Sequence, residues 1–347
     1  MKTNRIIYLL LIMMLIWIAA LNFGLSNLSK KENAQVINEY NINGFSTDFT
    51  RIVDECKPSI VTINADGNIL SGFVYYQEKD SVYILTAYHG VSQTNMISVT
   101  FGSSYTEAAE LVGHDIYTDL AVLRINTPYE IATLKLGDST LTKQGEFVIC
   151  IGTPVSADYA GSVEMGMIAA RDLMIENNIT ADEEHYSYYL DVIQLSADLA
   201  YGYSGSPLIN MSGEIIGMNT MSLPGDFTFA ITSNEIKLIA DKIIAKEDNI
   251  RNILGIKGSY IRNMYNYEKT NLGVSLETIN GIYVSKVKEN TPAYQAGVRP
   301  GDVVLSINEK EINSLNDYLS IVHTPAEDIV FTYSRHGDIH VQGLGND

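Results

Sequence analysis

A serine between two glycines is the first residue in this sequence whose setting suits catalysis. The segment GYSGSPL at 202–208 places Ser204 on a tight turn, followed by a proline and an apolar run. Gly202 lets the backbone turn so that the N–H groups of Gly202 and Ser204 point at one spot, where they would hold the oxyanion of a tetrahedral intermediate. Serine alone is a weak nucleophile, so this chemistry also needs a base.

A histidine and an aspartate supply the missing groups. His89 follows the apolar run YILTAY, where a rigid strand can hold an imidazole, and Asp119 opens the run DLAVLRI, so that its carboxylate could orient that imidazole. The other histidines lie in polar or turn-like contexts: His114, His185, His323, His336 and His340. The order His89, Asp119, Ser204, with gaps of 30 and 85 residues, is that of the chymotrypsin-type triad.

Short β-type runs separated by turn residues must position these groups. Valine, isoleucine, tyrosine and threonine dominate the runs, and no helical pattern intervenes between about residues 52 and 232. The fold class is therefore mainly β, and this length fits two small barrels better than one. The runs are SIVTIN (59–64), SGFVYY (71–76), SVYILTA (81–87), LAVLRI (120–125), EFVICIG (146–152), YLDVIQL (189–195), SPLIN (206–210), EIIGMNT (214–220) and FTFAIT (227–232).

One helix and a separate unit follow the β-rich region. Apolar residues recur at helical spacing after Ser233, which is a plausible N-cap; they are Ile236, Ile239, Ala240, Ile243 and Ile244. Residues 251–345 then alternate strands and short helices: GIYVSKV (281–287), TPAYQAGV (291–298), GDVVLSIN (301–308) and SLNDYLSIV (314–322).

The N-terminus predicts a membrane anchor. Residues 6–21 form one apolar run, IIYLLLIMMLIWIAAL, and only Asn22 interrupts its continuation to residue 25, so its length is close to the ~20 residues that cross a bilayer. Lys2 and Arg5 precede it, so residues 1–5 should stay in the cytoplasm and the rest of the chain should face outward. We expect a single-pass anchor at 6–25 in the cell membrane and a linker at 26–50. A cleaved signal peptide is the alternative.

Composition excludes several classes of protein. The chain has 347 residues, of which 46% are hydrophobic and 18% charged, so a folded core is expected. Its net charge of −18 argues against nucleic acid as a partner. The only cysteines, Cys56 and Cys150, exclude a disulfide framework, and we favour two buried thiols over a pair.

The motifs together resemble the HtrA (DegP/DegS-type) serine proteases, which carry a C-terminal PDZ domain. The stretches that carry the resemblance are SGFVYY, YILTAYHGV, TDLAVLRI, IQLSADLAYGYSGSPLIN, GEIIGMNT and FAITSNEI. The resemblance implies a chymotrypsin-like double barrel at 51–248, with His89 as general base, Asp119 as its orienter and Ser204 as nucleophile. It also implies that Gly202 and Ser204 supply the oxyanion hole, and that the protein is a homotrimer.

Three positions depart from the family pattern. Tyr203 stands where the family usually has asparagine, Ser206 where it usually has glycine, and Tyr88 where asparagine or alanine is frequent. No catalytic side chain is lost. Tyr203 and Ser206 could change how easily the oxyanion turn adopts its active form, so the triad is better supported than activity at rest.

The specificity pocket and the PDZ loop are also predicted. Residues beside the nucleophile and on the following strands should line the pocket: Ala200, Tyr201, Met221 and Phe229. None is acidic, so a small or branched apolar substrate residue is expected rather than lysine or arginine. The stretch GIYVSKVKENTPAYQAGVRPGDVVLSINEKEI resembles a PDZ domain, which binds peptide C-termini. We place its carboxylate loop at Leu254-Gly255-Ile256, with Leu272-Gly273-Val274 as the rival.

Three functions follow from these patterns. The first is an ATP-independent endopeptidase that cleaves unfolded or damaged exported proteins. The second is a chaperone or scaffold with little protease activity, and the third a regulatory protease with one membrane substrate. We expect no cofactor and no metal, since the sequence shows neither a Cys/His ligand spacing nor a Walker-type loop.

Overall fold

The computed structural model describes Met14, Trp17 and residues 42–343, apart from 182–183, 224–226, 248–250, 325 and 327. The chain divides into two units, Met1–Arg51 and Ile52–Asp347. Except for Met14 and Trp17, the predicted anchor at 6–25 lies outside the described residues. Within the described part, no helix is long and apolar enough to cross a membrane.

A helix occupies part of the predicted linker. Helix α2 spans Ile42–Cys56, so regular structure begins before residue 51, where we expected the first folded residue. Phe49, Ile52 and Cys56 recur at i, i+3 and i+7, which is helical spacing, and Ile52 and Cys56 are buried. Residues 42–50 of the predicted linker at 26–50 are therefore helical.

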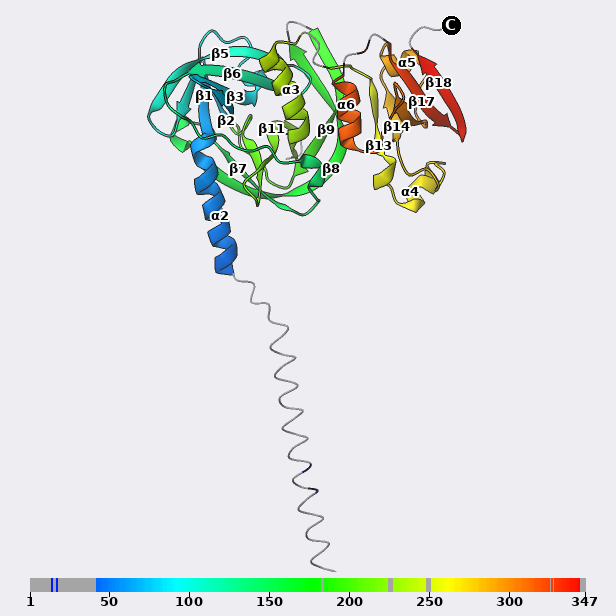
Figure 1. The fold of residues 1–347 in the computed structure, drawn as a ribbon, viewed down its shortest axis with the longest axis horizontal. Coiled ribbons are helices and arrows are strands. Elements are labelled where there is room, and N and C mark those ends of the chain that lie inside the picture. The colour runs from blue at the N-terminus through cyan, green and yellow to red at the C-terminus, as the bar shows by residue number, and fades with distance from the viewer. Residues whose placement is uncertain are drawn as a thin grey trace, which may run out of the picture. The chain divides into compact units, whose positions relative to one another are not determined.

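Two closed six-stranded antiparallel barrels confirm the predicted fold class (Figure 1). The first barrel has the strand order β1-β2-β3-β6-β5-β4 and the second β10-β11-β12-β9-β8-β7. The first comprises β1 (Ile60–Ala65), β2 (Asn68–Glu78), β3 (Ser81–Ala87), β4 (Ile97–Phe101), β5 (Tyr105–Asp115) and β6 (Leu120–Asn126). The second comprises β7 (Phe147–Gly152), β8 (Ser162–Ala181), β9 (Glu184–Leu195), β10 (Pro207–Asn210), β11 (Ile215–Leu223) and β12 (Phe227–Thr232).

Strand pairing in the first barrel places the base beside its orienter. Strands β3 and β6 pair antiparallel, with Ala87 opposite Leu120 at the end of the ladder. His89 follows β3 by two residues, and Asp119 precedes β6 by one. Two residues 30 apart in sequence are thereby brought to the same edge of the barrel.

One amphipathic helix follows the second barrel. Helix α3 spans Ser233–Ala245, and its N-cap is Thr232, one residue before the predicted Ser233. Thr232 accepts a hydrogen bond from the N–H of Glu235. The predicted apolar face is buried at Ile236, Ile239, Ala240 and Ile243.

The C-terminal part of the chain, where the sequence resembles a PDZ domain, forms a sheet of its own. Five strands run in the order β13-β14-β15-β17-β18, and β16 pairs with β15. In chain order the elements are β13 (Ile256–Tyr260), α4 (Asn266–Asn271), β14 (Ile282–Val287), α5 (Pro292–Gln295), β15 (Val303–Ile307), β16 (Lys310–Glu311), α6 (Leu315–Val322), β17 (Val330–Arg335) and β18 (Asp338–Gly343). Figure 1 shows α6 and β13 on the side of this domain that faces β8 and β9.

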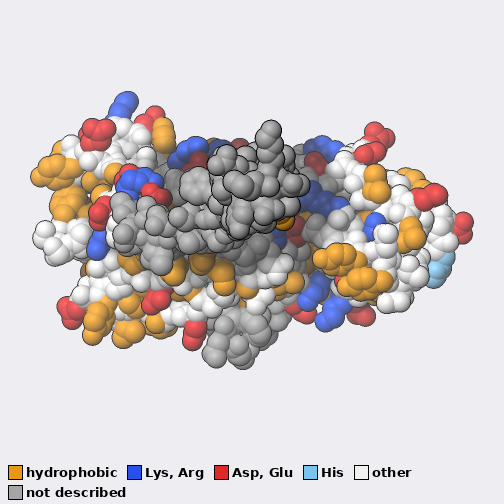
Figure 2. Space-filling view, turned by 90° about the horizontal axis from the view of Figure 1, so that it is seen from below, with side chains coloured by type: hydrophobic (Ala, Val, Ile, Leu, Met, Phe, Trp, Pro, Cys, Tyr) orange, Lys and Arg blue, Asp and Glu red, His pale blue; other side chains and the backbone are white. Residues whose placement is uncertain are grey.

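Charge is distributed in small groups on the surface. Figure 2 shows acidic and basic side chains interspersed with apolar ones on the visible, described part of one face. The net charge of the chain is −18. On this face, basic side chains between the acidic ones reduce the repulsion between negative charges.

Candidate active site

His89 and Asp119 form a hydrogen-bonded pair at the edge of the first barrel. His89 lies in the short 3₁₀ turn Tyr88–Gly90 after β3, and its Nδ1 is 2.6 Å from Asp119 Oδ2. The backbone N–H of His89 donates to the other carboxylate oxygen, Oδ1, at 2.6 Å. The imidazole is half-exposed, whereas the carboxylate is buried. One carboxylate thus fixes both the backbone and the ring of the histidine.

Asp119 is itself held from several sides. Its φ is +58°, a left-handed conformation that aspartate adopts more readily than most residues. Its carbonyl oxygen accepts from the N–H of Tyr88 at 2.8 Å, and the Thr220 hydroxyl donates to its carboxylate. Thr220 comes from β11, so the second barrel also supports the pair.

The environment of His89 alters its protonation. Burial opposes the charged imidazolium, but the hydrogen bond and the negative charge of Asp119 outweigh burial, so the pKa of His89 is raised above its ordinary value. A base with a raised pKa accepts the serine proton with a larger driving force.

The Ser204 turn needs glycine on both sides. Gly202 has φ +98°, and a Cβ there would meet Thr153 O at 2.3 Å. Gly205 has φ +84°, and a Cβ would meet Ser71 O at 2.3 Å. In the described part of the chain, the N–H groups of Gly202 and Ser204 have no hydrogen-bond acceptor, whereas those of Tyr203 and Ser206 are bonded within the turn.

Ser71, which the sequence did not single out, anchors this turn. Its hydroxyl donates to Gly202 O at 2.7 Å and accepts from the N–H of Thr153 at 2.8 Å. Its backbone N–H donates to Ser204 O at 3.1 Å. Ser71 lies on β2 and is fully buried, so the first barrel holds the nucleophile turn of the second. The only sequence feature that could have drawn attention to Ser71 is its place in SGFVYY, one of the stretches that resemble the family.

The two unusual residues of the turn are accommodated by the second barrel. The Tyr203 side chain is buried, and its ring packs over Gly152, where a Cβ would come within 2.7 Å of a ring atom. The Ser206 hydroxyl is buried and accepts from Asn219 Nδ2 at 2.9 Å. Ser206 is therefore both packed and hydrogen-bonded, whereas Tyr203 is packed but its buried hydroxyl has no hydrogen-bond partner among the described residues.

A pocket of about 420 Å³ lies between the base and the nucleophile. It is lined by His89, Leu199, Ala200, Tyr201, Tyr203, Ser204, Asn219, Thr220 and Thr228. Two predicted residues, Ala200 and Tyr201, are among them. Phe229 is instead buried in the barrel, and the Met221 side chain lies outside the described residues. Sequence reasoning missed Asn219, Thr220 and Thr228, which barrel pairing brings to the pocket.

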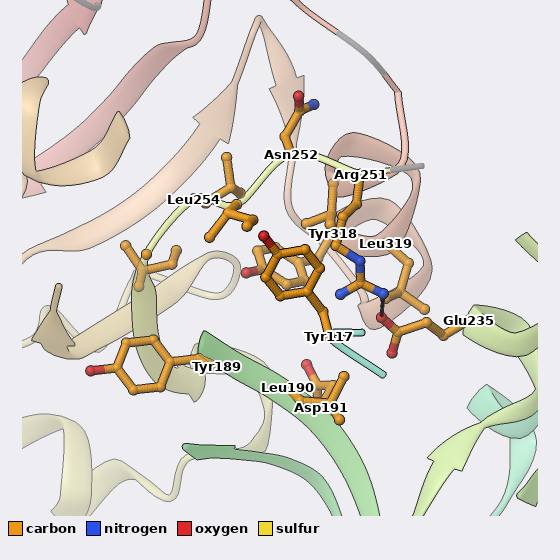
Figure 3. A pocket seen from close by; sticks show the side chains of 14 residues that line it. Tyr117, Tyr189, Leu190, Asp191, Glu235, Arg251, Asn252, Leu254, Tyr318 and Leu319 are labelled. Atoms are coloured by element: carbon orange, nitrogen blue, oxygen red, sulfur yellow. Dashed lines mark hydrogen bonds and ion pairs between the residues drawn. The ribbon is translucent and has the colours of Figure 1, made fainter. Parts of the chain in front are cut away.

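The first predicted PDZ loop lines a pocket. Leu254, Gly255 and Ile256 line a cavity together with residues of α6, as Figure 3 shows for the labelled Leu254, Tyr318 and Leu319. The rival, Leu272-Gly273-Val274, follows α4 in a turn, and Leu272 is exposed. The assignment of the carboxylate loop to 254–256 stays a prediction.

The cysteines and acidic residues suggest no other chemistry. Cys56 and Cys150 are both buried free thiols, which confirms the favoured interpretation. Burial raises the pKa of the Cys150 thiol to about 12, which suppresses its reactivity. Among the described residues, no cluster of three or more histidine, cysteine or acidic side chains is placed to hold a metal ion.

Comparison with known families separates the two parts of the chain. Residues 70–218 match the trypsin-like peptidase domain, and residues 268–340 match the PDZ domain. The first match contains all three predicted triad residues, His89, Asp119 and Ser204.

Individual relatives combine both parts. The serine protease Do-like HtrA of Lactobacillus helveticus is 31% identical over 80% of this chain and 68% of that protein. The serine protease Do-like HtrB of Bacillus subtilis is 33% identical over 73% of this chain. The chain spans 56% of that protein's length and 58% of the HtrA of the same organism, or slightly more than half of each.

Two solved structures are similar to this chain over most of its length. The HtrA-type protease AlgW with a tripeptide is 27% identical, with a TM-score of 0.62, over 85% of this chain and 95% of that one. The serine endoprotease from Yersinia pestis is 26% identical, with a TM-score of 0.54, over 85% of this chain and 96% of that one.

Proposed function

The chain belongs to the HtrA-type trypsin-like serine proteases with a PDZ domain, and we propose that it is an ATP-independent endopeptidase that cleaves unfolded or damaged exported polypeptides. The observation that carries this proposal is the pair of His89 and Asp119, 2.6 Å apart, facing a pocket that Ser204 also lines. A scaffold without peptidase activity has no need of this pair.

The proposed reaction is acyl transfer. His89 takes the proton of the Ser204 hydroxyl as the serine oxygen attacks the scissile carbonyl, and then gives that proton to the departing amine. Asp119 keeps the ring in position and stabilises its positive charge. The free N–H groups of Gly202 and Ser204 bind the oxyanion. Water repeats the sequence on the acyl-enzyme and releases the second product.

The pocket supports cleavage after uncharged residues. Apart from His89, its lining carries no ionisable group other than two tyrosines, so a lysine or arginine side chain would find no carboxylate there. We expect small or branched apolar residues at the position before the scissile bond. We also expect small uncharged polar residues to be accepted there, because Asn219, Thr220 and Thr228 contribute amide and hydroxyl groups to the pocket.

Three further proposals concern the setting of the enzyme. The apolar run at 6–21 behind Lys2 and Arg5 supports a single-pass anchor in the cell membrane, with the catalytic domain outside the cytoplasm. Resemblance to the family supports a homotrimer. The closeness of Leu254-Gly255-Ile256 to α6 supports binding of peptide C-termini at the PDZ domain.

Cleavage of unfolded casein by the full-length chain tests the proposed function. We expect the wild type to cut casein and the Ser204→Ala variant to leave it intact with an unchanged melting temperature. Ser212→Ala, an exposed serine on the same barrel, is the matched control and should cut at the wild-type rate. A wild type that cuts no casein, with or without a peptide bearing a hydrophobic C-terminus, would move the assignment to a chaperone or scaffold.

A further inference from the structure

One exposed tyrosine joins the two barrels beside the nucleophile. Tyr201 directly precedes Gly202, the first proposed oxyanion donor, and it is 66% exposed. Its hydroxyl nevertheless donates a hydrogen bond to Asn68 Oδ1. Asn68 opens β2 of the first barrel, 133 positions earlier in the chain. An exposed ring without such a partner can change rotamer freely, so this bond holds the Tyr201 ring in one position between the barrels.

The tyrosine is held at both ends. Its carbonyl oxygen accepts from the N–H of Val155 at 2.8 Å. Its partner Asn68 donates from Nδ2 to the carbonyl oxygen of Gly90 at 3.1 Å, and Gly90 directly follows the base, His89. The Tyr201–Asn68 bridge, meaning this hydrogen-bonded pair, therefore connects the turn of the nucleophile with the turn of the base.

The segment that holds the tyrosine backbone is strained. Val155 has φ +61°, a left-handed conformation that is unfavourable for a β-branched residue. Its side chain is exposed, so packing does not explain the strain. Such a conformation persists where surrounding contacts impose it, and the bond from the Val155 N–H to Tyr201 O is one such contact. Strain of this kind clusters at binding and catalytic positions, which points to a function for the place that Tyr201 occupies.

The bridge stands at the edge of the pocket that takes the residue before the scissile bond. Tyr201 lines this pocket together with Thr220 and Thr228, whereas Asn68 is not among its described lining residues. The substrate chain fills the pocket on one side of His89 and leaves on the other, because His89 gives its proton to the departing amine. The side that remains for this amine is that of Asn68. The bridge therefore faces the residue after the scissile bond.

A tyrosine held in this way limits the size of that residue. A small side chain fits beside the ring, but a large one must push the ring aside. The ring cannot move aside without losing its bond to Asn68, and Asn68 is tied in turn to the segment after His89. Large side chains at this position therefore carry an energetic penalty that small ones do not.

We propose that Tyr201 determines which residue can follow the scissile bond. With its ring held by Asn68, it admits glycine, alanine or serine at that position and excludes large side chains such as leucine and phenylalanine. The inference rests on the proposed function, to which it adds a second preference. The substrate class becomes polypeptide sites with a small or branched uncharged residue before the scissile bond and a small residue after it.

Paired peptides measure this preference. The probes are two decapeptides with one central valine before the scissile bond, followed by alanine in one and by leucine in the other. Their cleavage by the full-length chain gives a ratio of kcat/KM, alanine over leucine. General damage to the triad slows both peptides and leaves this ratio unchanged. We expect a ratio of at least ~30 for the wild type, and a ratio below ~3 for Tyr201→Ala, which lacks the ring.

Further variants separate the hydrogen bond from the bulk of the ring. Tyr201→Phe keeps the ring but frees it from Asn68, so the ratio should fall at least ~5-fold. Asn68→Ala breaks the same bond and should give the same fall, and the double variant should fall no further. Tyr129→Phe, an exposed tyrosine after β6, is the matched control and should keep the wild-type ratio.

Two results would overturn the proposal. A wild-type ratio below ~3 would show that the position after the scissile bond is not restricted. A Tyr201→Phe ratio equal to that of the wild type would show that the bridge does not hold the ring against the substrate.

Labelling of Ser204 by a fluorophosphonate distinguishes these results from failure of the proposed function. The leaving group of this probe is fluoride, which needs no room beside Tyr201. A chain that is labelled but does not discriminate between the peptides refutes the inference alone. A chain that is neither labelled nor able to cut either peptide refutes the proposed function and the inference with it.

Discussion

The pocket at the triad and the groove of the PDZ domain differ in the space that they offer a ligand. The first measures about 420 Å³ and is open to substrate, and the second measures about 30 Å³ and is filled by its own chain. The open pocket is braced by bonds between the two barrels, from Ser71 to Gly202 and from Thr220 to Asp119. The closed groove is braced by bonds between the domains, from Arg251 to Asp115 and from Tyr260 to Asp191.

This difference separates two functions of buried polar contacts. Contacts between the barrels hold catalytic groups in a geometry needed at every turnover. Contacts between the domains stabilise the conformation in which the groove is closed, and this conformation must open when a peptide binds. Substitutions in the first set should therefore lower the cleavage rate, and substitutions in the second set should change the contacts between the domains.

Loss of the Asp119 charge should have the largest effect. Asp119→Asn keeps the shape of the side chain but no longer holds His89 in the required tautomer, so kcat should fall by about 10⁴-fold. Steady-state kinetics on a chromogenic peptide would measure this fall; a fall in kcat below 10-fold would remove Asp119 from the proposed triad.

Loss of the Ser71 hydroxyl should have an intermediate effect. Ser71→Ala leaves Gly202 O and the Thr153 N–H without their partner, which loosens the turn that supplies the oxyanion donors. We expect kcat to fall by about 10-fold to 100-fold with little change in KM, somewhat less than for direct loss of an oxyanion donor. Ser285→Ala, an exposed serine of the PDZ domain, is the control. Equal rates for both variants would show that the turn does not need Ser71.

The pH dependence should report His89. Only the neutral imidazole accepts the serine proton, so kcat/KM should rise with pH up to the pKa of His89, by as much as ~10-fold per pH unit. Because Asp119 holds this pKa above its ordinary value of ~6.5, the midpoint should lie above that pH. In Asp119→Asn the midpoint should move down. A flat profile from pH 5 to 8 is incompatible with His89 as the base.

A substitution in the groove wall should have the smallest effect and leave catalysis alone. Burial raises the pKa of Asp191 to about 7, against a smaller lowering by the Tyr260 hydrogen bond. Its folded-state pKa exceeds its unfolded value, so its contribution to stability falls as pH rises from about 4 to about 7. In Asp191→Asn no carboxyl group ionises at this position, so stability is not lost there as pH rises. The melting temperature of this variant should exceed that of the wild type by a few degrees at pH 8 but not at pH 4. Equal differences at both pH values would mean that Asp191 does not titrate in this range.

The sequence predicted what local pattern determines. The turn GYSGSPL could be recognised because Gly202 and Gly205 need positive φ, and the two barrels could be recognised from short runs with turn residues between them. His89 could be recognised as a base after one apolar run and Asp119 as its orienter at the start of another, but only the pairing of β3 with β6 shows that they lie at one edge of the barrel. The helical face from Ile236 to Ile243 was equally clear from its period.

The remainder depends on contacts between residues far apart in the chain. Ser71 and Gly202 are separated by 131 positions, and Asn219 reaches the pocket only because the second barrel closes. Phe229 and Thr228 are neighbours on one strand, so their side chains point to opposite faces, and Thr228 is the one that lines the pocket. The contact of Tyr117 with the PDZ groove joins two domains, and no local pattern in either domain signals it.

Reaction of the full-length chain with a fluorophosphonate probe tests the central claim most directly. The account predicts one adduct per chain by intact mass, mapped to Ser204, absent in Ser204→Ala and formed far more slowly in His89→Ala. Because the probe needs an activated serine but no particular substrate, this result does not depend on the choice of casein or peptide. A wild type that stays unlabelled, or labels at a serine other than Ser204, would contradict the account.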